Sequence, residues 1–228
     1  MGLTSFWMRR LFLNILSPIE GECFVAYHIS IRQKFYLPFK RAIDIFGSTL
    51  GIVVLSPALI ICTILTKLTS KGPVFFRQPR YGKDQKEFRI YKFRSMKTTA
   101  KLAGAEDISD KERAQMVTKW GEFMRKTSLD EIPQLFNVFV GDMSFIGPRP
   151  CMSEGEEELT EARLSTVPTA YAVKPGISGM AQIYLHRHHD PVKKAEYDSL
   201  YARKFNFWLD TKLFLLSFLV AFGFYKGK

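Results

Sequence analysis

The sequence predicts an α/β fold that is mainly helical, carries a small β-hairpin and associates with a membrane. Residues 42–66 form an apolar run of 25 residues between basic flanks. As a straight helix this run would be about 37 Å long, which is enough to cross a bilayer. Residues 74–94 hold short aromatic stretches around a turn, as a hairpin does. Most of the remaining chain is polar and reads as helices and loops.

Charge is distributed unevenly along the 228 residues, whose formal net charge is +11. Residues 1–100 hold 16 Lys and Arg against 5 Asp and Glu, whereas residues 101–228 hold 17 of each. Basic residues next to a membrane segment each gain about 1 kcal/mol near an anionic leaflet. We therefore expect anionic membrane lipids as partners. Because Cys23, Cys62 and Cys151 show no metal-ligand spacing, a reducing cytosolic setting is favoured over a disulfide framework.

Ser56-Pro57 interrupts the apolar run. Proline removes a backbone donor and clashes with the carbonyl of Val53, so the helix must bend there. The Ser56 hydroxyl can satisfy a freed backbone group. Basic residues flank both ends of the run, which places both flanks in the cytoplasm. A re-entrant helix satisfies both facts, and a single kinked crossing stays open as the alternative.

The run divides the chain into three expected parts. Residues 1–38 form an N-terminal extension at the membrane interface, residues 39–70 the re-entrant helix, and residues 71–228 a cytoplasmic domain. The apolar stretch from Leu213 to Tyr225 is too short to cross a bilayer and predicts an interfacial helix. Inside the run, Asp44 shares a helix face with Lys40 and Arg41, and we expect the three charges to neutralise one another.

Residues 87–94 alternate as a strand, so Lys92 and Arg94 share one face. That face is either a positive wall for an anion or a solvated sheet surface. Further along, Ser128-Leu129-Asp130-Glu131 has the pattern of a capping box, in which Glu131 bonds back to the Ser128 amide. The same position at a helix start can also keep Asp130 ionised and attract phosphate. An ionised aspartate can attack phosphorus, and an adjacent glutamate can hold Mg²⁺.

Two tight loops could complete such a site. Arg149 stands between two prolines, which restrict the backbone and suit a guanidinium for bidentate phosphate binding. A surface turn is the alternative. The second loop, residues 174–179, begins at Lys174, and its glycines permit close backbone approach to a ligand.

Several short motifs follow one another along the chain: Lys40-Arg41-Ala42-Ile43-Asp44, Ser56-Pro57, Gly72-Pro73-Val74-Phe75-Phe76-Arg77-Gln78, Tyr91-Lys92-Phe93-Arg94-Ser95-Met96, Leu129-Asp130-Glu131-Ile132-Pro133-Gln134-Leu135, Asn137-Val138, Gly141-Asp142-Met143-Ser144, Gly147-Pro148-Arg149-Pro150 and Lys174-Pro175-Gly176-Ile177-Ser178-Gly179. With these motifs in this order, residues 39–222 resemble the bacterial sugar transferases, also called monotopic phosphoglycosyl transferases. Residues 183–189 depart from the pattern often found there, so the resemblance does not predict the sugar.

The resemblance implies a fold, a location and an activity. It implies a re-entrant helix bent at Ser56-Pro57 and an enzyme on the cytoplasmic face of the bacterial inner membrane. Asp130 would be the nucleophile, Glu131 the Mg²⁺ ligand and Arg149 a phosphate contact. The enzyme would move a sugar phosphate from a nucleoside diphosphate sugar, with uridine as the expected base, to polyprenyl phosphate. Such a step initiates exopolysaccharide, capsule, O-antigen or glycoprotein glycan synthesis.

A different class of function stays open. A basic, membrane-anchored scaffold without catalytic activity would share the charge and the apolar run, although it has no need of the Asp130-Glu131 dyad. We expect no nucleic-acid partner, because no nucleic-acid motif is present. Lys92, Arg94 and Lys174 are further candidates for substrate phosphate binding, and a homodimer is left open.

Overall fold

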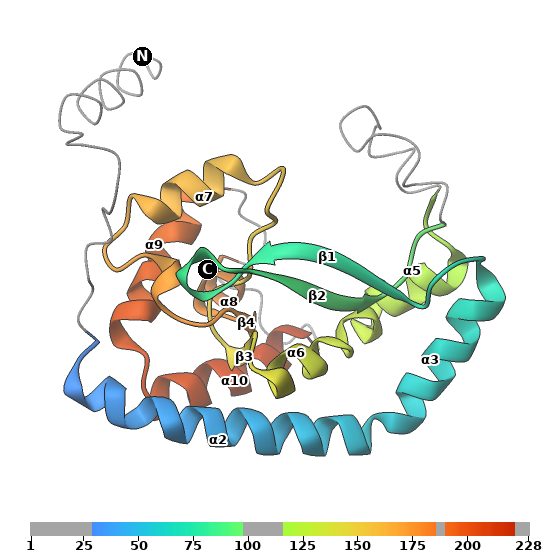
Figure 1. Cartoon of the computed structure of the whole chain (residues 1–228), viewed down its shortest axis with the longest axis horizontal. Helices are drawn as coiled ribbons and strands as arrows, with labels where there is room; N and C mark the ends of the chain where they lie inside the picture. The colour runs from blue at the N-terminus through green and yellow to red at the C-terminus, as the bar shows by residue number, and fades with distance from the viewer. Residues whose placement is uncertain (1–28, 98–115, 186–189, 222–228) are drawn as a thin grey trace, which may run out of the picture.

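The computed structural model describes residues 29–97, 116–185 and 190–221. A long helix runs along one edge, and the other elements lie to one side of it (Figure 1). Most of the expected extension 1–38 and the histidine-rich stretch 186–189 lie outside the described residues. The elements are α2 (Ile31–Val54), α3 (Ser56–Thr69), β1 (Phe75–Tyr81), η1 (Lys83–Gln85), β2 (Glu87–Phe93), α5 (Lys119–Lys126), η3 (Leu129–Glu131), α6 (Gln134–Val140), β3 (Ser144–Ile146), α7 (Glu157–Leu164), η4 (Ala170–Ala172), β4 (Gly176–Ser178), α8 (Met180–Tyr184), α9 (Pro191–Lys204) and α10 (Phe207–Ala221).

The apolar run folds as two helices, α2 and α3, that meet at an angle of 61°. The Ser56 hydroxyl donates to the Val53 carbonyl at 2.7 Å, so the group freed by Pro57 has a local partner. The bend predicted at Ser56-Pro57 is therefore confirmed. Among the described residues, no single helix is long and apolar enough to cross a bilayer, and α2 with α3 meets that criterion only as a bent pair. Helix α2 begins at Ile31, earlier than the expected boundary at residue 39.

The predicted hairpin is confirmed. Strands β1 and β2 pair antiparallel from Phe75 opposite Phe93 to Tyr81 opposite Glu87. The aromatic ring of Phe93 is 2% exposed and packs with Cys62 of α3 and Met124 of α5. This cluster attaches the hairpin to the second half of the bent helix.

A second, parallel pair joins β3 to β4. It brings the Gly147-Pro148-Arg149-Pro150 loop against the loop that begins at Lys174. A Cβ placed on Gly176 would lie 2.1 Å from the Gly147 amide nitrogen. The expectation that glycine here admits a ligand is corrected at Gly176, because the close approach is between two backbone segments.

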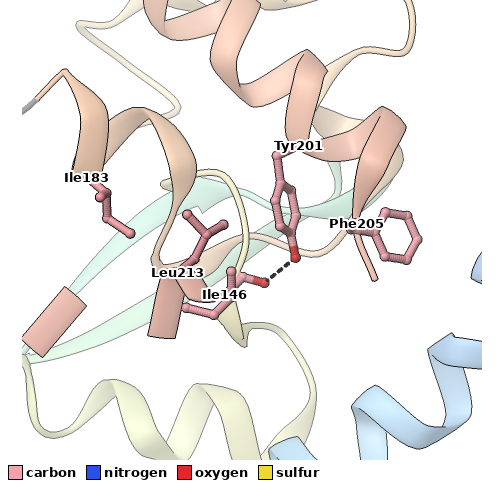
Figure 2. Close-up of a cluster of buried hydrophobic side chains, with 5 residues drawn as sticks. All are labelled: Ile146, Ile183, Tyr201, Phe205 and Leu213. Carbon is pink, nitrogen blue, oxygen red and sulfur yellow. Dashed lines mark hydrogen bonds between the residues drawn. The ribbon is translucent and has the colours of Figure 1, made fainter. Parts of the chain in front are cut away.

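The main core lies between β3, α8, α9 and α10, where Ile146, Ile183, Tyr201, Phe205 and Leu213 pack together (Figure 2). The Tyr201 hydroxyl lies 3.0 Å from the Ile146 carbonyl oxygen. No water can reach this position, since Tyr201 is 1% exposed. The core therefore satisfies its own polar atoms, as buried groups must.

The charges of α2 connect that helix to the rest of the molecule. The Lys40 ammonium pairs with the Asp210 carboxylate of α10. Arg41 donates to the carbonyls of Val138 and Phe139 at 2.7 Å each, which closes the C-terminal end of α6. The expected compensation of Asp44 by these two cations is present, and contacts between elements add to it.

Asp44 follows the same pattern. One carboxylate oxygen accepts from the Ser144 hydroxyl at 3.0 Å and from the Phe145 amide at 3.1 Å. Both donors belong to β3, so Asp44 fixes this strand on α2. Its role is structural, and these hydrogen bonds add to the charge compensation expected from Lys40 and Arg41.

Candidate active site

The Asp130-Glu131 dyad lies on a short 3-10 turn between α5 and α6. Ser128 before it has φ +57° and makes no side-chain capping bond. The capping box considered for this stretch is therefore wrong. Instead, the Glu131 amide donates to the Ser128 carbonyl at 3.2 Å. This backbone bond forms the turn and leaves the Glu131 carboxylate available to other elements.

Two cations approach the Glu131 carboxylate. The Lys92 ammonium from β2 lies 2.6 Å from one oxygen, and an Arg149 guanidinium nitrogen lies 3.8 Å from the same oxygen. Burial alone would raise the pKa of Glu131, but Lys92 and Arg149 outweigh burial and hold it below the usual range. Glu131 is therefore ionised at neutral pH.

Asp130 has a different environment. Burial is the largest effect and raises the pKa of Asp130, and the negative charge of Glu131 raises it further. Lys92 and Arg125 oppose this shift without cancelling it. The dyad thus combines one carboxylate paired with two cations and one whose pKa is raised by burial and by its neighbour.

Arg149 lies where the sequence predicts a cation, on the rigid loop after β3. Its side chain is 48% exposed. The Pro148 carbonyl accepts from the Gly176 amide at 2.9 Å, and the Pro150 carbonyl accepts from Arg80 at 2.9 Å. The loop is fixed on both sides of Arg149 while the guanidinium stays open to solvent.

Arg94 does not contact the dyad as Lys92 does. It is 7% exposed and donates to the Ser70 side chain at 3.0 Å and to the Ser70 carbonyl at 2.6 Å. It also donates to the Pro73 carbonyl. Because these bonds hold the guanidinium at the C-terminal end of α3, we remove Arg94 from the candidate phosphate-binding residues.

Lys174 lies at the far end of α6 from the dyad, next to Gly141. A Cβ on Gly141 would lie 3.3 Å from the Lys174 ammonium and 3.2 Å from an Arg41 guanidinium nitrogen. Burial, and then the charge of Arg41, lower the pKa of Lys174. The structure therefore does not bring Lys174 together with Lys92 and Arg149.

The donor set around the dyad suits Mg²⁺. This ion binds through one or two carboxylates and completes its shell with waters and substrate phosphates. Glu131 supplies such a carboxylate next to Asp130. The described part of the chain has no group of three or more His, Cys, Asp or Glu that could hold a metal alone. Substrate phosphates would have to complete the coordination.

Two buried arginines near Arg149 were not predicted. Arg80 of β1 contacts Pro150, and Arg163 of α7 lies 3.0 Å from Asp198 of α9 and 2.7 Å from the Cys151 sulfur. Arg163 belongs to α7, whose glutamate-rich sequence would predict a helix exposed to solvent. Its partner follows 35 positions later, so no local pattern reveals the pair.

A model of the bacterial sugar transferase family matches residues 35–223. The chain belongs to the bacterial sugar transferase family. The matched region includes the dyad, Lys92 and Arg149.

Curated relatives share this region. The chain is 42% identical over 209 residues to a UDP-glucose:undecaprenyl-phosphate glucose-1-phosphate transferase of Klebsiella pneumoniae, covering 90% of the chain and 44% of the relative. It is 38% identical to a UDP-N-acetylgalactosamine-undecaprenyl-phosphate N-acetylgalactosaminephosphotransferase of Aeromonas hydrophila, covering 82% of the chain and 45% of the relative. An exopolysaccharide production protein of Rhizobium leguminosarum bv. phaseoli is 41% identical, covering 64% of the chain and 74% of that protein. The chain spans less than half the length of the first two.

Proposed function

We propose that this protein transfers a sugar-1-phosphate from a uridine diphosphate sugar to undecaprenyl phosphate at the cytoplasmic face of the inner membrane. The observation that carries this proposal is the Asp130-Glu131 dyad beside Lys92 and Arg149, in a chain of the bacterial sugar transferase family. Relatives named for this reaction with glucose or N-acetylgalactosamine support it.

The proposed reaction has two steps. An Asp130 carboxylate oxygen attacks the phosphorus that bears the sugar, and the bond from that phosphorus to the bridging oxygen breaks. Uridine monophosphate leaves with the bond electrons, and the sugar phosphate stays on Asp130 as an acyl phosphate. An oxygen of undecaprenyl phosphate then attacks the same phosphorus and returns Asp130 to its carboxylate form.

The neighbouring side chains would lower the charge repulsion in both steps. Lys92 and Arg149 lie next to the place where a diphosphate must bind, and guanidinium suits paired phosphate oxygens. Glu131 is the residue that would hold Mg²⁺, which neutralises charge on the phosphates and leaving group when bound. Preorganised positive charge of this kind is a large source of rate enhancement.

Membrane association would bring the lipid acceptor to the dyad. Both α2 and α3 expose large apolar side chains, including Phe46 at 72%, Val54 at 63% and Leu68 at 76%. Exposed apolar surface on this scale marks an interaction site. We propose that the bent pair enters and leaves the bilayer on the cytoplasmic side, as the basic residues on both flanks favour.

The proposal is tested with purified full-length protein, Mg²⁺, undecaprenyl phosphate and a panel of UDP-sugars. We expect release of uridine monophosphate with one or a few donors. Without lipid, intact mass spectrometry should show the protein gain one sugar phosphate, and hydroxylamine should remove it. Asp130→Asn should gain nothing, because it lacks the anionic nucleophile. Adduct formation or normal turnover by Asp130→Asn would exclude the covalent mechanism.

A further inference from the structure

Arg80 holds the chain directly after Arg149. It lies near the end of β1 and is 8% exposed. One guanidinium nitrogen donates to the Pro150 carbonyl at 2.9 Å, and another donates to the Gln78 side chain at 2.9 Å. The next residue of β1 adds a third contact, because the Tyr81 amide donates to the Cys151 carbonyl at 3.0 Å. The end of β1 therefore determines the path of the chain after Arg149.

The chain before Arg149 is fixed independently by β4. The Gly147 amide donates to the Ser178 carbonyl at 2.9 Å, and the Pro148 carbonyl accepts from the Gly176 amide at 2.9 Å. Before Arg149 these contacts are between backbone groups. After Arg149 the Arg80 side chain is one of the holding groups, and it can be changed without rebuilding a sheet.

Placing a guanidinium here is unfavourable in itself. Burial lowers the pKa of Arg80, and the positive charge of Arg149 lowers it as well, while Glu156 opposes both. Glu156 lies 3.8 Å from Arg80, and its carboxylate also accepts from the Met152 amide at 2.7 Å. A buried cation close to a second cation requires this compensation, since an unpaired buried charge is strongly destabilising.

We propose that Arg80 is a positioning residue for Arg149. By holding the Pro150 carbonyl, Arg80 orients the loop so that the Arg149 guanidinium faces Glu131, 3.8 Å away. This inference rests on the proposed function, in which Arg149 binds the donor diphosphate. Arg80 itself is 8% exposed, and its two terminal nitrogens are taken up by Pro150, Gln78 and Glu156, so it acts through Arg149 and not on the substrate.

A double-mutant cycle separates positioning from general structure. We measure kcat/KM for Arg80→Met, Arg149→Met and the double variant, with UDP-glucose or UDP-N-acetylgalactosamine, whichever the wild type turns over faster. Arg80→Met should lower kcat/KM by about 10- to 100-fold, the cost of misplacing a substrate-binding group. In the Arg149→Met background the same change should cost less than about twofold, because residues that act together are not additive.

The controls address charge and folding. Arg89→Met removes one cation from the exposed surface of the same hairpin and should leave kcat/KM unchanged. Arg80→Lys keeps the charge and one donor, so we expect an intermediate loss. If Arg80→Met does not fold, Arg80→Lys replaces it in the cycle. Equal losses in both backgrounds would overturn the positioning role.

A binding measurement keeps this result distinct from the proposed function. We also measure the affinity for UDP with Mg²⁺ by calorimetry for the same four proteins. Arg80→Met should weaken UDP binding when Arg149 is present and should have little effect in the Arg149→Met background. If the wild type neither binds UDP nor turns over any donor, the proposed function fails, and the inference with it. If the wild type is active and the cycle is additive, only the inference fails.

Discussion

Lys92 lies in β2 and Arg94 directly follows that strand, and their side chains meet different partners. Lys92 pairs with Glu131 of the dyad, whereas Arg94 binds carbonyls at the end of α3. The sequence predicts their shared face, because strand alternation is local. It cannot predict which neighbour each cation reaches, since that depends on where α3 and η3 pack. Residue type and alternation therefore identify candidates without separating catalytic from structural cations.

These different partners predict that replacement by Met affects mainly stability at Arg94 and mainly catalysis at Lys92. Arg94→Met should lower the free energy of unfolding by roughly 2 kcal/mol or more, since bonds from a charged donor are lost. Donor affinity of the folded fraction should stay unchanged. Lys92→Met should lower the free energy of unfolding less than Arg94→Met, since Glu131 keeps Arg149 as a partner, and should strongly slow adduct formation. Denaturant melts and adduct kinetics on both variants check this, and equal kinetic losses would restore Arg94 to the site.

The buried pair of Arg163 and Asp198 leads to a stability prediction. Their side chains are 3% and 1% exposed. Arg163→Met leaves an uncompensated buried carboxylate, so the free energy of unfolding should fall by about 3–5 kcal/mol. As a matched control, Lys126→Met breaks an exposed pair with Glu122 and should leave the free energy of unfolding nearly unchanged. Similar losses for both variants in denaturant melts would contradict this assignment.

At the scale of elements, the bend between α2 and α3 was predictable because its causes are neighbours in sequence. Pro57 lacks the amide, and the Ser56 hydroxyl binds the Val53 carbonyl. The hairpin was predictable for the same reason. The parallel pair of β3 and β4 was not, because each strand has three residues and shows no periodicity. Its geometry comes from glycines whose contacts are far away in the chain.

The bend also permits a test of topology. Single cysteines at Lys34 and Lys71, on exposed positions of the two flanks, should be labelled from the cytoplasm only. Pro57→Ala restores the amide and removes the clash, so the helix should straighten and expose one of them to the periplasm. Activity should fall together with the change. Periplasmic labelling in the otherwise unchanged protein would exclude the re-entrant arrangement.

At the scale of the whole molecule, the excess positive charge and the exposed apolar helices support the same expectation, binding to an anionic membrane. Val54→Asp places a charge beside the bend. It should weaken binding to phosphatidylethanolamine–phosphatidylglycerol vesicles about 100-fold, because placing a charged side chain in the bilayer costs about 2.5–3.5 kcal/mol. Val192→Asp makes the same change at a 53% exposed position of the polar helix α9 and should have little effect. Cosedimentation compares the two, and equal losses would show that α3 and the bend are not the membrane contact.

The sequence predicts more of the fold than of the contacts within the candidate site. The bend and the hairpin follow from turn residues and strand alternation. Long-range ion pairs do not, because Lys40 and Asp210 stand 170 positions apart. The dyad could be named from the family resemblance, whereas the pairing of Glu131 with Lys92 required the three-dimensional structure.

Helix α6 connects the dyad turn to a contact with α2. The dyad immediately precedes it, and Arg41 of α2 binds the carbonyls at its other end. Seven residues of helix correspond to a length of about 10 Å. Because Leu135 at its start also packs against Gly51, α6 lies along α2 and holds the dyad turn at a fixed position on that helix. On the proposed function, the enzyme then measures the depth of the acceptor's phosphate and not the length of its tail. Acceptors with shorter or longer prenyl chains should therefore react at similar rates once they are in the bilayer.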